Sequence, residues 1–461
     1  MSRTLDAVLW GPRDFVDRLA RTAPARLAVT AFGGIIAVFV ALLSLPVATA
    51  SGHRAPFVDA VFTAVSAVSV TGLTTVPTGE YWSTWGHVVI LAGIQVGGFG
   101  VMTLASLAGL AVSRHLGLTS KLLAATETKT TRLGEVGSLI RTVVIASVTI
   151  ETALALVLFP RLLQTEGDAG SAAWHAVFYA VSSFNNAGFV PTPEGLVPFL
   201  ADWWVLLPIA VGVFLGSLGF PVLLALAGTW RGRRRWRRWS LHTRLTIVTS
   251  LVLVVLGTVT IGAFEWTNPA TLGSQDGGTR VLSALFAGVM PRSGGFSTID
   301  VGQMREATWL MTDALMFVGG GSASTAGGIK VTTLAILLIA IVAEARGDRD
   351  MDVWGRRIPR STLRLAVTVS FVGATAVLVA CLVLLTLTDW TLDVVLFETL
   401  SAFGTCGLST GVTAQLPDAG KYVIAALMFV GRTGTMTVAA ALALRERRRV
   451  IRYPEERPII G

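Results

Sequence analysis

Val70-Thr71-Gly72-Leu73 ends a short apolar stretch of this chain, and three more apolar stretches end on a glycine-centred tetrapeptide in the same way. The other three are Asn186-Ala187-Gly188-Phe189, Ser293-Gly294-Gly295-Phe296 and Thr405-Cys406-Gly407-Leu408. The central glycines recur at nearly equal intervals, which indicates a fourfold internal repeat. Four equivalent backbone loops around one axis, with carbonyls turned inward, are the requirement for binding a dehydrated monovalent cation. We therefore expect the tetrapeptides to meet around a cation path.

The composition indicates a membrane protein. The 461 residues are 52% apolar and 14% charged, whereas soluble proteins carry about 25% charged residues. A nucleic-acid-binding protein would not combine the net charge of +9 with this hydrophobicity, so we expect no nucleic-acid partner. The two cysteines, Cys381 and Cys406, lie in apolar or loop sequence, and a disulfide between them is not expected. The N-terminal segment lacks the layout of a cleavable signal and is interpreted as retained.

Eight apolar segments are expected to cross the membrane as helices. Five are free of charged residues: Leu27–Ala50, Thr84–Ser113, Trp203–Trp230, Leu245–Phe264 and Leu365–Thr388. Three contain a few charges: Thr142–Pro160, Ala307–Val342 and Tyr422–Leu444. Of the charged residues inside these segments, Glu151 is interpreted as an interhelical hydrogen-bonding group rather than an ion ligand.

In chain order the eight segments form four consecutive pairs. Between the two members of each pair lies one shorter apolar segment that ends at a tetrapeptide. The four are Pro56–Ser69, Ser171–Asn185, Val281–Arg292 and Thr391–Gly404. At about 12–15 residues they are too short to cross ~30 Å of hydrocarbon and suit re-entrant helices. The predicted fold is an all-α polytopic membrane protein whose four helix–pore helix–loop–helix repeats have pseudo-fourfold symmetry around one ion pore. We predict a cytosolic N-terminal segment at 1–24, repeats at 25–115, 136–230, 242–343 and 362–445, and a cytosolic tail at 446–461.

The basic residues predict the orientation. Most of the 37 Lys and Arg residues lie at the N-terminus, between the repeats and in the C-terminal tail. Positive residues mark the cytoplasmic side, so both termini are expected in the cytosol and the glycine loops are expected to open outward. The arginine-rich stretch Arg231–Arg238 is interpreted as part of this signal. A docking surface for a cytosolic partner or for anionic membrane lipid is the alternative.

Backbone chemistry explains why glycine stands at the centre of each loop. A helix that ends at the bilayer centre points its negative dipole end at whatever lies there, which favours a cation. Glycine allows positive φ, so successive carbonyls can turn toward an axis. The side chains beside the glycines vary, which fits backbone coordination better than side-chain coordination. The expected ion ligands are the backbone oxygens of Val70, Thr71, Gly72, Asn186, Ala187, Gly188, Ser293, Gly294, Gly295, Thr405, Cys406 and Gly407.

A second glycine-rich motif, Gly319-Gly320-Gly321-Ser322-Ala323-Ser324-Thr325-Ala326-Gly327-Gly328, lies in the middle of a predicted span. A continuous helix is not expected there, because each glycine costs ~1 kcal/mol relative to alanine. Irregular backbone at membrane depth is tolerated where it is buried or lines a watery cavity. A phosphate-binding P-loop is excluded, since Lys330 does not follow a glycine directly. We interpret the segment as a flexible intramembrane gate, with an unwound structural kink as the alternative.

Three basic residues and one acidic residue are predicted to support these loops. Arg432 lies mid-span, where a cation needs a partner or water. Facing the pore, it is expected to oppose cation passage and to anchor the gate through backbone carbonyls; a structural ion pair or snorkelling is the alternative. Lys330 is assigned to the gate or to snorkelling toward the cytosol. Arg292 is expected to brace the third loop against a carboxylate such as Glu398 or Asp300.

Several motifs together resemble the pore-forming subunit of the Trk/Ktr/HKT superfamily of potassium transporters, closest to the Ktr type. They are Phe184-Asn185-Asn186-Ala187-Gly188-Phe189, Pro291-Arg292-Ser293-Gly294-Gly295-Phe296, Gly407-Leu408-Ser409-Thr410-Gly411, Gly319 to Lys330 and Gly431-Arg432-Thr433-Gly434. The resemblance covers residues 25–445. It implies K⁺ as the transported ion, a bacterial plasma-membrane location, a homodimer, and a cytosolic ring of nucleotide- or NAD-binding subunits of the KtrA/TrkA type. The chain has no dinucleotide-binding unit of its own, so nucleotide control is expected from the partner and no tightly bound cofactor is expected here.

The loops also bear on selectivity and on rival functions. In plant relatives a serine in place of the first filter glycine goes with sodium transport, so Gly72 favours potassium. The positions two after each glycine are Thr74, Val190, Ser297 and Ser409, so a second filter glycine is missing and weaker discrimination against Na⁺ is expected. The alternatives are a Na⁺-permeable or Na⁺-coupled member of the same family, and a secondary solute transporter with broken helices. No catalytic constellation stands out, so an enzyme is not expected.

Overall fold

The computed structural model describes residues 24–115, 134–230 and 239–443. Nearly all of the predicted terminal segments 1–24 and 446–461, and the stretch 231–238, lie outside these ranges. Within them the chain is helical except for loops, short 3-10 turns and one two-stranded hairpin. The hairpin, which the all-α prediction did not include, pairs β1 (Met351–Val353) with β2 (Arg356–Ile358) and connects two helices.

The helices follow one another in four groups, each with a long first helix, a short second helix and one or two further helices. Group one is α2 (Pro24–Leu43), α3 (Phe57–Ser69) and α5 (Thr84–His115); group two is α7 (Gly134–Glu166), α8 (Ala169–Phe184), α9 (Trp203–Leu218) and α10 (Phe220–Trp230). Group three is α11 (Leu241–Glu265), α12 (Gly277–Val289), α13 (Glu306–Phe317) and α14 (Val331–Arg346); group four is α15 (Arg360–Leu387), α16 (Leu392–Gly404) and α17 (Asp418–Ala443).

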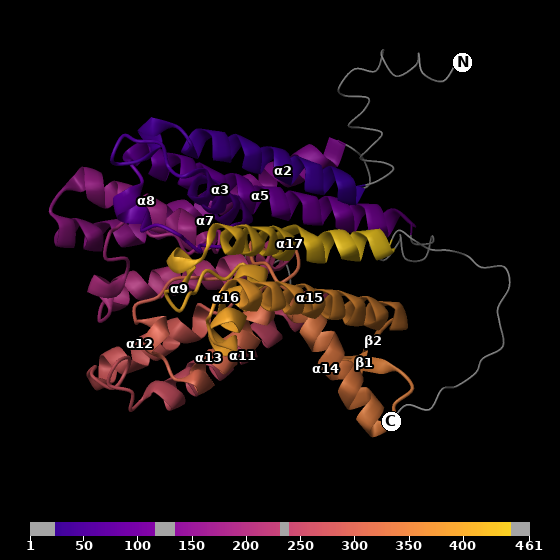
Figure 1. The fold of residues 1–461 in the computed structure, drawn as a ribbon. Helices are drawn as coiled ribbons and strands as arrows, with labels where there is room; N and C mark the ends of the chain where they lie inside the picture. The colour runs from indigo at the N-terminus through magenta and orange to yellow at the C-terminus, as the bar shows by residue number, and fades with distance from the viewer. Residues whose placement is uncertain (1–23, 116–133, 231–238, 444–461) are drawn as a thin grey trace, which may run out of the picture.

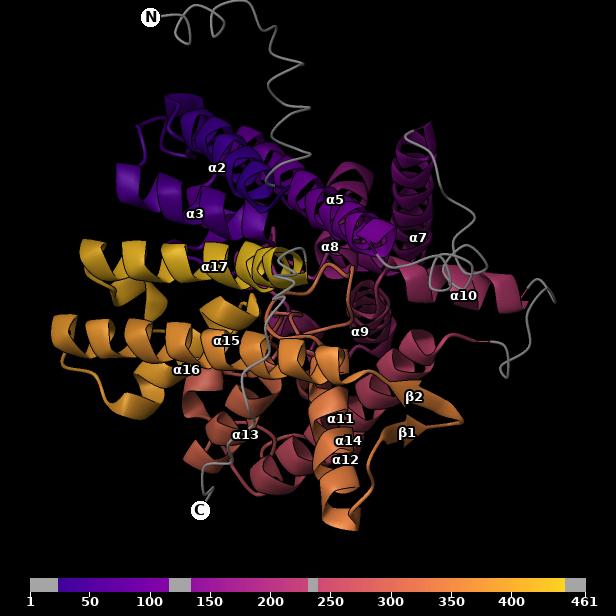
Figure 2. The same cartoon turned by 90° about the vertical axis from the view of Figure 1, so that its right-hand side faces the viewer.

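The four groups pack in a closed order. Group one contacts group two through α5, α7 and α8, group two contacts group three through α9, α11 and α12, and group three contacts group four through α13 and α16. The chain then returns on itself, because α17 packs against α2, α3 and α5 (Figures 1 and 2). The last helix group is therefore joined to the first by tertiary contacts.

The short helices α3, α8, α12 and α16 occupy nearly the ranges predicted from the apolar pattern. Two of them begin at an aspartate that accepts backbone hydrogen bonds, which is a common way to start a helix. Asp168 accepts from Ser171 N at 2.7 Å, and Asp276 accepts from Gly278 N at 3.1 Å. α3 and α16 end directly before their tetrapeptides, α8 ends one residue earlier, and α12 ends at Val289, three residues short of Ser293.

The described residues contain three helices long and apolar enough to cross a membrane, namely Arg141–Glu166, Leu241–Glu265 and Arg360–Leu387. The pair α9 and α10 makes a fourth if it counts as one span. These spans carry exposed apolar side chains, as lipid-facing surfaces do; Phe371 on α15 is 73% exposed.

The predicted continuous span Trp203–Trp230 is wrong in one respect, because the helix breaks at Gly219. The axes of α9 and α10 differ by 107° across this residue. Gly219 has φ 88° and ψ 151°, a conformation that side chains disfavour, and Pro221 lacks an N–H and suits the first turn of the new helix. Phe220 N–H donates outside its own helix, to Ala323 O at 3.1 Å.

Candidate functional site

Three of the four short helices, α3, α8 and α16, lead into their tetrapeptides with the same pair of hydrogen bonds, whereas after α12 Gly294 N–H donates to Met290 O at 2.8 Å. At the end of α3, Val70 N–H donates to Ala67 O at 3.1 Å and Thr71 N–H donates to Ser66 O at 2.8 Å. The same pair of bonds ends α8 and α16. Two of the four glycine N–H groups are also satisfied locally, since Gly72 N donates to the hydroxyl of Ser66 at 3.1 Å and Gly407 N to that of Ser401 at 3.1 Å.

Two residues of each tetrapeptide have positive φ. Two positions before the glycine, φ is 55° at Val70, 62° at Asn186, 63° at Ser293 and 43° at Thr405. At the glycine, φ is 89° at Gly72, 70° at Gly188, 73° at Gly295 and 94° at Gly407; the residue between has negative φ. Positive φ is a real outlier for β-branched residues such as Val70 and Thr405, and such strain concentrates at functional sites. The sign of φ therefore alternates along each tetrapeptide, in the same way in all four.

The four glycines lie against one another in cyclic order. A methyl group added to any of them would meet the backbone of the next tetrapeptide, and the fourth would meet the first. The contacts are Gly72 with Ala187 O, Gly188 with Gly295 Cα, Gly295 with Cys406 O, and Gly407 with Thr71 O. The added carbon on Gly295 would lie 2.5 Å from the oxygen of Cys406, closer than real Cβ atoms approach. Side chains are therefore excluded where the four loops meet.

The side chains of the tetrapeptides are kept out of this shared space. Two positions before each glycine, and at Thr71, Ala187 and Cys406, the residues are at most 1% exposed, whereas the four central glycines are half-buried. The side chains before the glycines thus pack into the protein and hold the loops. A ring of peptide groups without intruding side chains is the kind of arrangement that coordinates a monovalent cation.

No helix forms between α13 and α14, as the glycine content predicts; we call residues 318–330 the glycine-rich loop. The loop folds against itself and against the broken end of α9. Its backbone bonds are Gly319 N to Ile329 O (3.0 Å), Val331 N to Gly320 O (3.0 Å) and Gly321 N to Ser217 O (2.7 Å). Most of its residues are buried.

The glycine-rich loop contacts the tetrapeptides, most closely the second and the fourth; Gly319 also lies near Ser293 of the third. Thr325 Oγ1 donates to Asn186 Oδ1 at 2.8 Å, which ties the loop to the second tetrapeptide. Gly327 faces the side chain of Thr405 in the fourth tetrapeptide so closely that a methyl group on the glycine would clash with it. The loop is thus seated directly against residues that were predicted to form the ion site.

Besides Arg292, whose Nη2 donates to Gly319 O at 3.5 Å, two basic side chains hold the glycine-rich loop through its carbonyls. Arg432, which is 1% exposed, donates from Nη1 to Thr325 O and from Nη2 to Gly97 O, the latter at 3.3 Å. Lys330 Nζ donates to Ala326 O at 2.6 Å. In the described part of the chain neither cation has a carboxylate partner, so backbone oxygens take that role.

The predicted pairing of Arg292 with Glu398 or Asp300 is wrong. Arg292 leaves the end of α12 toward α11, where Nη1 donates to Ser250 O and Nη2 to Ser250 Oγ, each at 3.0 Å. Asp300 instead accepts from Gly302 N at 2.9 Å and caps the turn η4 (Val301–Gln303). The two carboxylates lie on chain segments that Arg292 does not face.

Glu398 fastens the chain that follows the fourth tetrapeptide. It is 1% exposed and accepts from Ser409 Oγ at 2.7 Å, Thr410 N at 2.9 Å and Thr413 Oγ1 at 2.6 Å. A carboxylate that accepts several hydrogen bonds fixes the donors relative to its own helix. Glu398 on α16 therefore supports the fourth loop, but without Arg292.

The second tetrapeptide has a polar support of its own. Asn185 Nδ2 donates to Glu151 Oε1 and to Gln95 Oε1, both at 3.0 Å, and Gln95 Nε2 donates to Glu151 at 3.0 Å. The interhelical role expected of Glu151 is confirmed, because it links α7 to α5 and α8. The sequence analysis missed Gln95, Asn185 and Thr325 as supports. One feature of the sequence could have pointed to Thr325: it is the β-branched residue in a stretch otherwise made of glycine, alanine and serine.

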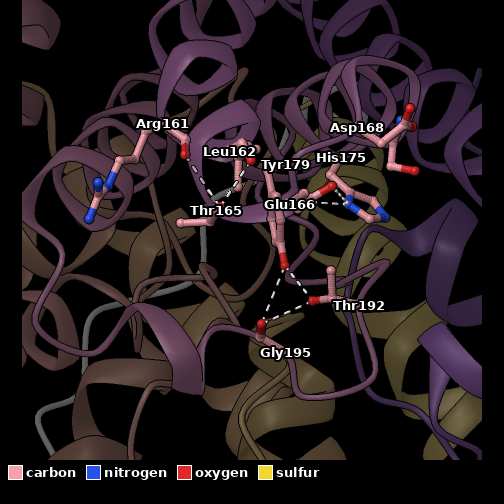
Figure 3. A network of polar contacts seen from close by, with 10 residues as sticks. Arg161, Leu162, Thr165, Glu166, Asp168, His175, Tyr179, Thr192 and Gly195 are labelled. Atoms are coloured by element: carbon pink, nitrogen blue, oxygen red, sulfur yellow. Dashed lines mark hydrogen bonds and ion pairs between the residues drawn. The ribbon is translucent and has the colours of Figure 1, made fainter.

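The chain after the second tetrapeptide is fastened to α8 (Figure 3). Tyr179 OH lies 2.7 Å from Thr192 Oγ1, and both hydroxyls bond Gly195 O. His175 Nδ1 lies 2.9 Å from both carboxylate oxygens of Glu166 and joins α8 to the end of α7. A cavity of about 770 Å³ lies beside this network, but none of the predicted ion-site residues lines it.

Comparisons with known proteins identify the family. Residues 23–450 match the sequence profile of TrkH, described as a cation transport protein. The chain is 35% identical to Ktr system potassium uptake protein B of Bacillus subtilis over 449 residues, which are 97% of this chain and 99% of that protein. It is 33% identical to potassium/sodium uptake protein NtpJ of Enterococcus hirae over 455 residues, which cover 96% of this chain and 98% of that protein.

A solved structure supports the same assignment at the level of fold. The crystal structure of the potassium transporter TrkH from Vibrio parahaemolyticus matches with a TM-score of 0.73 at 16% identity and covers 92% of this chain and 85% of that one. The resemblance inferred from the glycine motifs is confirmed, and the members of the family are transporters. This chain is a multi-pass membrane protein that belongs to the TrkH/Ktr family of cation transporters.

Proposed function

We propose that this protein takes up potassium ions across the bacterial plasma membrane through one pore lined by the four tetrapeptides. The observation that carries the proposal is the cyclic contact of the four glycines, which have matching backbone conformations and exclude side chains. Four matched turns of this kind can replace the hydration shell of a K⁺ ion with peptide oxygens. Relatives that match over nearly the whole chain are named for potassium uptake.

The filter ligands are the backbone oxygens of each tetrapeptide. They come from Val70, Thr71 and Gly72; Asn186, Ala187 and Gly188; Ser293, Gly294 and Gly295; and Thr405, Cys406 and Gly407. The carboxyl ends of α3, α8, α12 and α16 point their partial negative charge at the same place, which lowers the energy of a cation there. A second filter glycine is missing, so selectivity over Na⁺ is modest.

Each helix group contributes two crossings and one re-entrant helix, which gives eight crossings with pseudo-fourfold symmetry. The closing contact between α17 and α3 supports this arrangement, because a ring of four equivalent units must bring its last unit against its first. The inner crossings of groups two and three are broken, at Gly219 and at the glycine-rich loop. Both termini and the basic connections face the cytosol.

The glycine-rich loop is the gate of this pore. Gly319, Gly320, Gly321, Ser322, Gly327 and Gly328 supply its flexible backbone, and Lys330 and Arg432 hold it through carbonyl oxygens. The loop is seated against the second and fourth tetrapeptides, where it blocks the path below the filter. Opening requires those contacts to break.

The protein works as a homodimer with a cytosolic ring of regulatory subunits that bind nucleotide. The relatives named as parts of a "Ktr system" support a partner subunit. Expression in a bacterial strain that lacks potassium uptake, with and without a co-expressed cytosolic subunit, tests both proposals. Restored growth at low K⁺ is expected, and purified protein in liposomes should pass K⁺. An inserted protein that carries no K⁺ in either assay would contradict the function.

A Na⁺-permeable or Na⁺-coupled transporter is the second candidate. The relative from Enterococcus hirae is named a potassium/sodium uptake protein, and it matches 96% of this chain. Reversal potentials measured with K⁺ on one side of the membrane and Na⁺ on the other distinguish the two. A potential near zero would favour the second candidate over a potassium-selective pore.

A further inference from the structure

We infer that Thr325 couples the gate to the selectivity filter. Its hydroxyl holds the second filter loop only while the glycine-rich loop is seated, so gate position and ion selectivity change together. The inference rests on the proposed function, because it takes the tetrapeptides as the filter and the loop as the gate.

Thr325 is engaged at three points and is 0% exposed. Its N–H donates to Gly216 O at 3.4 Å, and its carbonyl accepts from Arg432 Nη1. Its Oγ1 donates to Asn186 Oδ1 at 2.8 Å and lies 3.4 Å from Phe184 O. The backbone of Thr325 is therefore held by the inner helices α9 and α17, while its side chain alone reaches the filter.

The side chain of Asn186 makes two hydrogen bonds, one to helix α9 and one to the glycine-rich loop. Its Nδ2 donates to Val213 O on α9 at 3.1 Å, and its Oδ1 accepts from Thr325. When the loop moves away, Oδ1 loses this donor in a buried place, and an unpaired buried acceptor costs more than the net value of the bond. The side chain must then reorient, at a residue whose backbone already has a φ of 62°. The backbone oxygens beside it move as a consequence.

The other three filter residues at the same position lack this link. Val70 is apolar, and Ser293 Oγ donates to Gly404 O at 2.8 Å within the filter and pore-helix region. Thr405 packs against Gly327, yet its buried Oγ1 has no hydrogen-bond partner. Arg292, directly before the third tetrapeptide, also donates to Gly319 O at 3.5 Å, but among the described tetrapeptide residues the hydrogen bond from the glycine-rich loop is accepted by Asn186 of the second. By reciprocity, K⁺ in the filter favours the seated loop by the same factor as the seated loop favours K⁺ in the filter.

The test uses the full-length protein in liposomes and compares Thr325→Val, Thr325→Ser and Thr399→Val. Valine keeps the shape of threonine and removes the hydroxyl. Thr399→Val is the matched control, because Thr399 is equally buried and its hydroxyl bonds only its own helix, at Val395 O and Leu396 O. Two quantities are measured: the K⁺ flux and the K⁺/Na⁺ permeability ratio from the reversal potential.

Thr325→Val is expected to raise K⁺ flux and to lower the K⁺/Na⁺ ratio, each by roughly 2- to 10-fold, the range that one buried hydrogen bond supports. Thr325→Ser should restore both, and Thr399→Val should change neither. In an Asn186→Ala background, Thr325→Val should have no further effect on the ratio.

Three results would overturn the coupling. One is a Thr325→Val protein with raised flux and an unchanged ratio, since the threonine would then only anchor the gate. Another is a variant equal to the unmodified protein in both readouts. The third is a further fall of the ratio in the Asn186→Ala background. If Thr325→Val does not fold, Thr325→Ala serves the same purpose, because it also removes the hydroxyl. Failure of the proposed function is distinguishable, because the unmodified protein would then carry no K⁺ at all.

Discussion

Lys421 Nζ lies 2.8 Å from Asp59 Oδ1 and thereby joins the last helix group to the first across 362 residues of sequence. Asp59 stands in the first turn of α3 and Lys421 in that of α17. The two side chains are 10% and 13% exposed. This ion pair fastens α17 to α3, where the last helix group packs against the first.

Removing one partner of this pair should destabilise the protein. Asp59→Asn leaves the ammonium of Lys421 mostly buried without a counter-charge, which costs on the order of 3 kcal/mol for buried pairs. Thermal unfolding in detergent, followed by tryptophan fluorescence, measures the change. Asp350→Asn is the control, because its pair with Arg357 is exposed, at 34% and 66%, and exposed pairs contribute about 0–1 kcal/mol. Equal shifts in the two variants would contradict the closing role of Lys421 and Asp59.

A methyl group at Gly295 should strongly reduce K⁺ transport. In Gly295→Ala the new carbon would lie 2.5 Å from Cys406 O, so the third and fourth loops must separate. We expect K⁺ flux to fall at least about tenfold, which corresponds to a cost of about 1.4 kcal/mol at the filter. Flux of K⁺ and of Na⁺ into liposomes measures the effect.

Gly411→Ala separates the clash from the backbone strain. Gly411 also has positive φ, 96°, but nothing lies within 4 Å of an added methyl group. Alanine there carries the conformational cost alone, and transport should be retained. If both variants transport equally well, the close contact of the four glycines has no functional meaning.

The sequence predicted those parts of the site that the backbone dictates. The tetrapeptides were recognisable because positive φ and close backbone approach both select glycine, so the requirement is visible at Gly72, Gly188, Gly295 and Gly407 without any knowledge of tertiary structure. The same holds for the glycine-rich loop, since its composition excludes a helix. The short helices were predictable because the apolar stretches before the tetrapeptides are too short for a span.

The side-chain partners were not predictable, because they depend on how distant helices pack. Arg292 was assigned a carboxylate by charge alone, whereas its donors reach Ser250 on α11. The break at Gly219 was missed for a related reason. A run of small residues suits both close helix packing and a kink, and here Ala323 O in the glycine-rich loop accepts the freed N–H of Phe220.

Glu398 variants should show a graded loss of stability and selectivity. Its Oε1 accepts from Ser409 Oγ and Thr410 N, while Oε2 accepts from Thr413 Oγ1. Glu398→Gln can keep the first oxygen as an acceptor and turn its amide toward a hydroxyl that also accepts, so a loss of about 1 kcal/mol is expected. Glu398→Ala leaves all these donors without their acceptor and should cost several times as much. Thermal unfolding and the K⁺/Na⁺ ratio check both; similar values for the two variants would contradict the acceptor role.

Releasing the glycine-rich loop should raise K⁺ flux. Arg432→Gln removes the two cationic bonds to Thr325 O and Gly97 O, and losing about 1.4 kcal/mol from the seated state raises the open population about tenfold. Deleting Gly319 to Gly328 should raise flux further, measured on protein that is well inserted and monodisperse.

Arg432→Lys distinguishes anchoring of the loop from repulsion of K⁺ by the charge of Arg432. Lysine keeps the positive charge but lacks the planar fork that reaches both carbonyls. If repulsion of K⁺ were the main effect, the lysine variant would match the unmodified protein. If anchoring is the main effect, its flux should rise toward that of the glutamine variant. Unchanged or lower flux in the deletion would refute the gate itself.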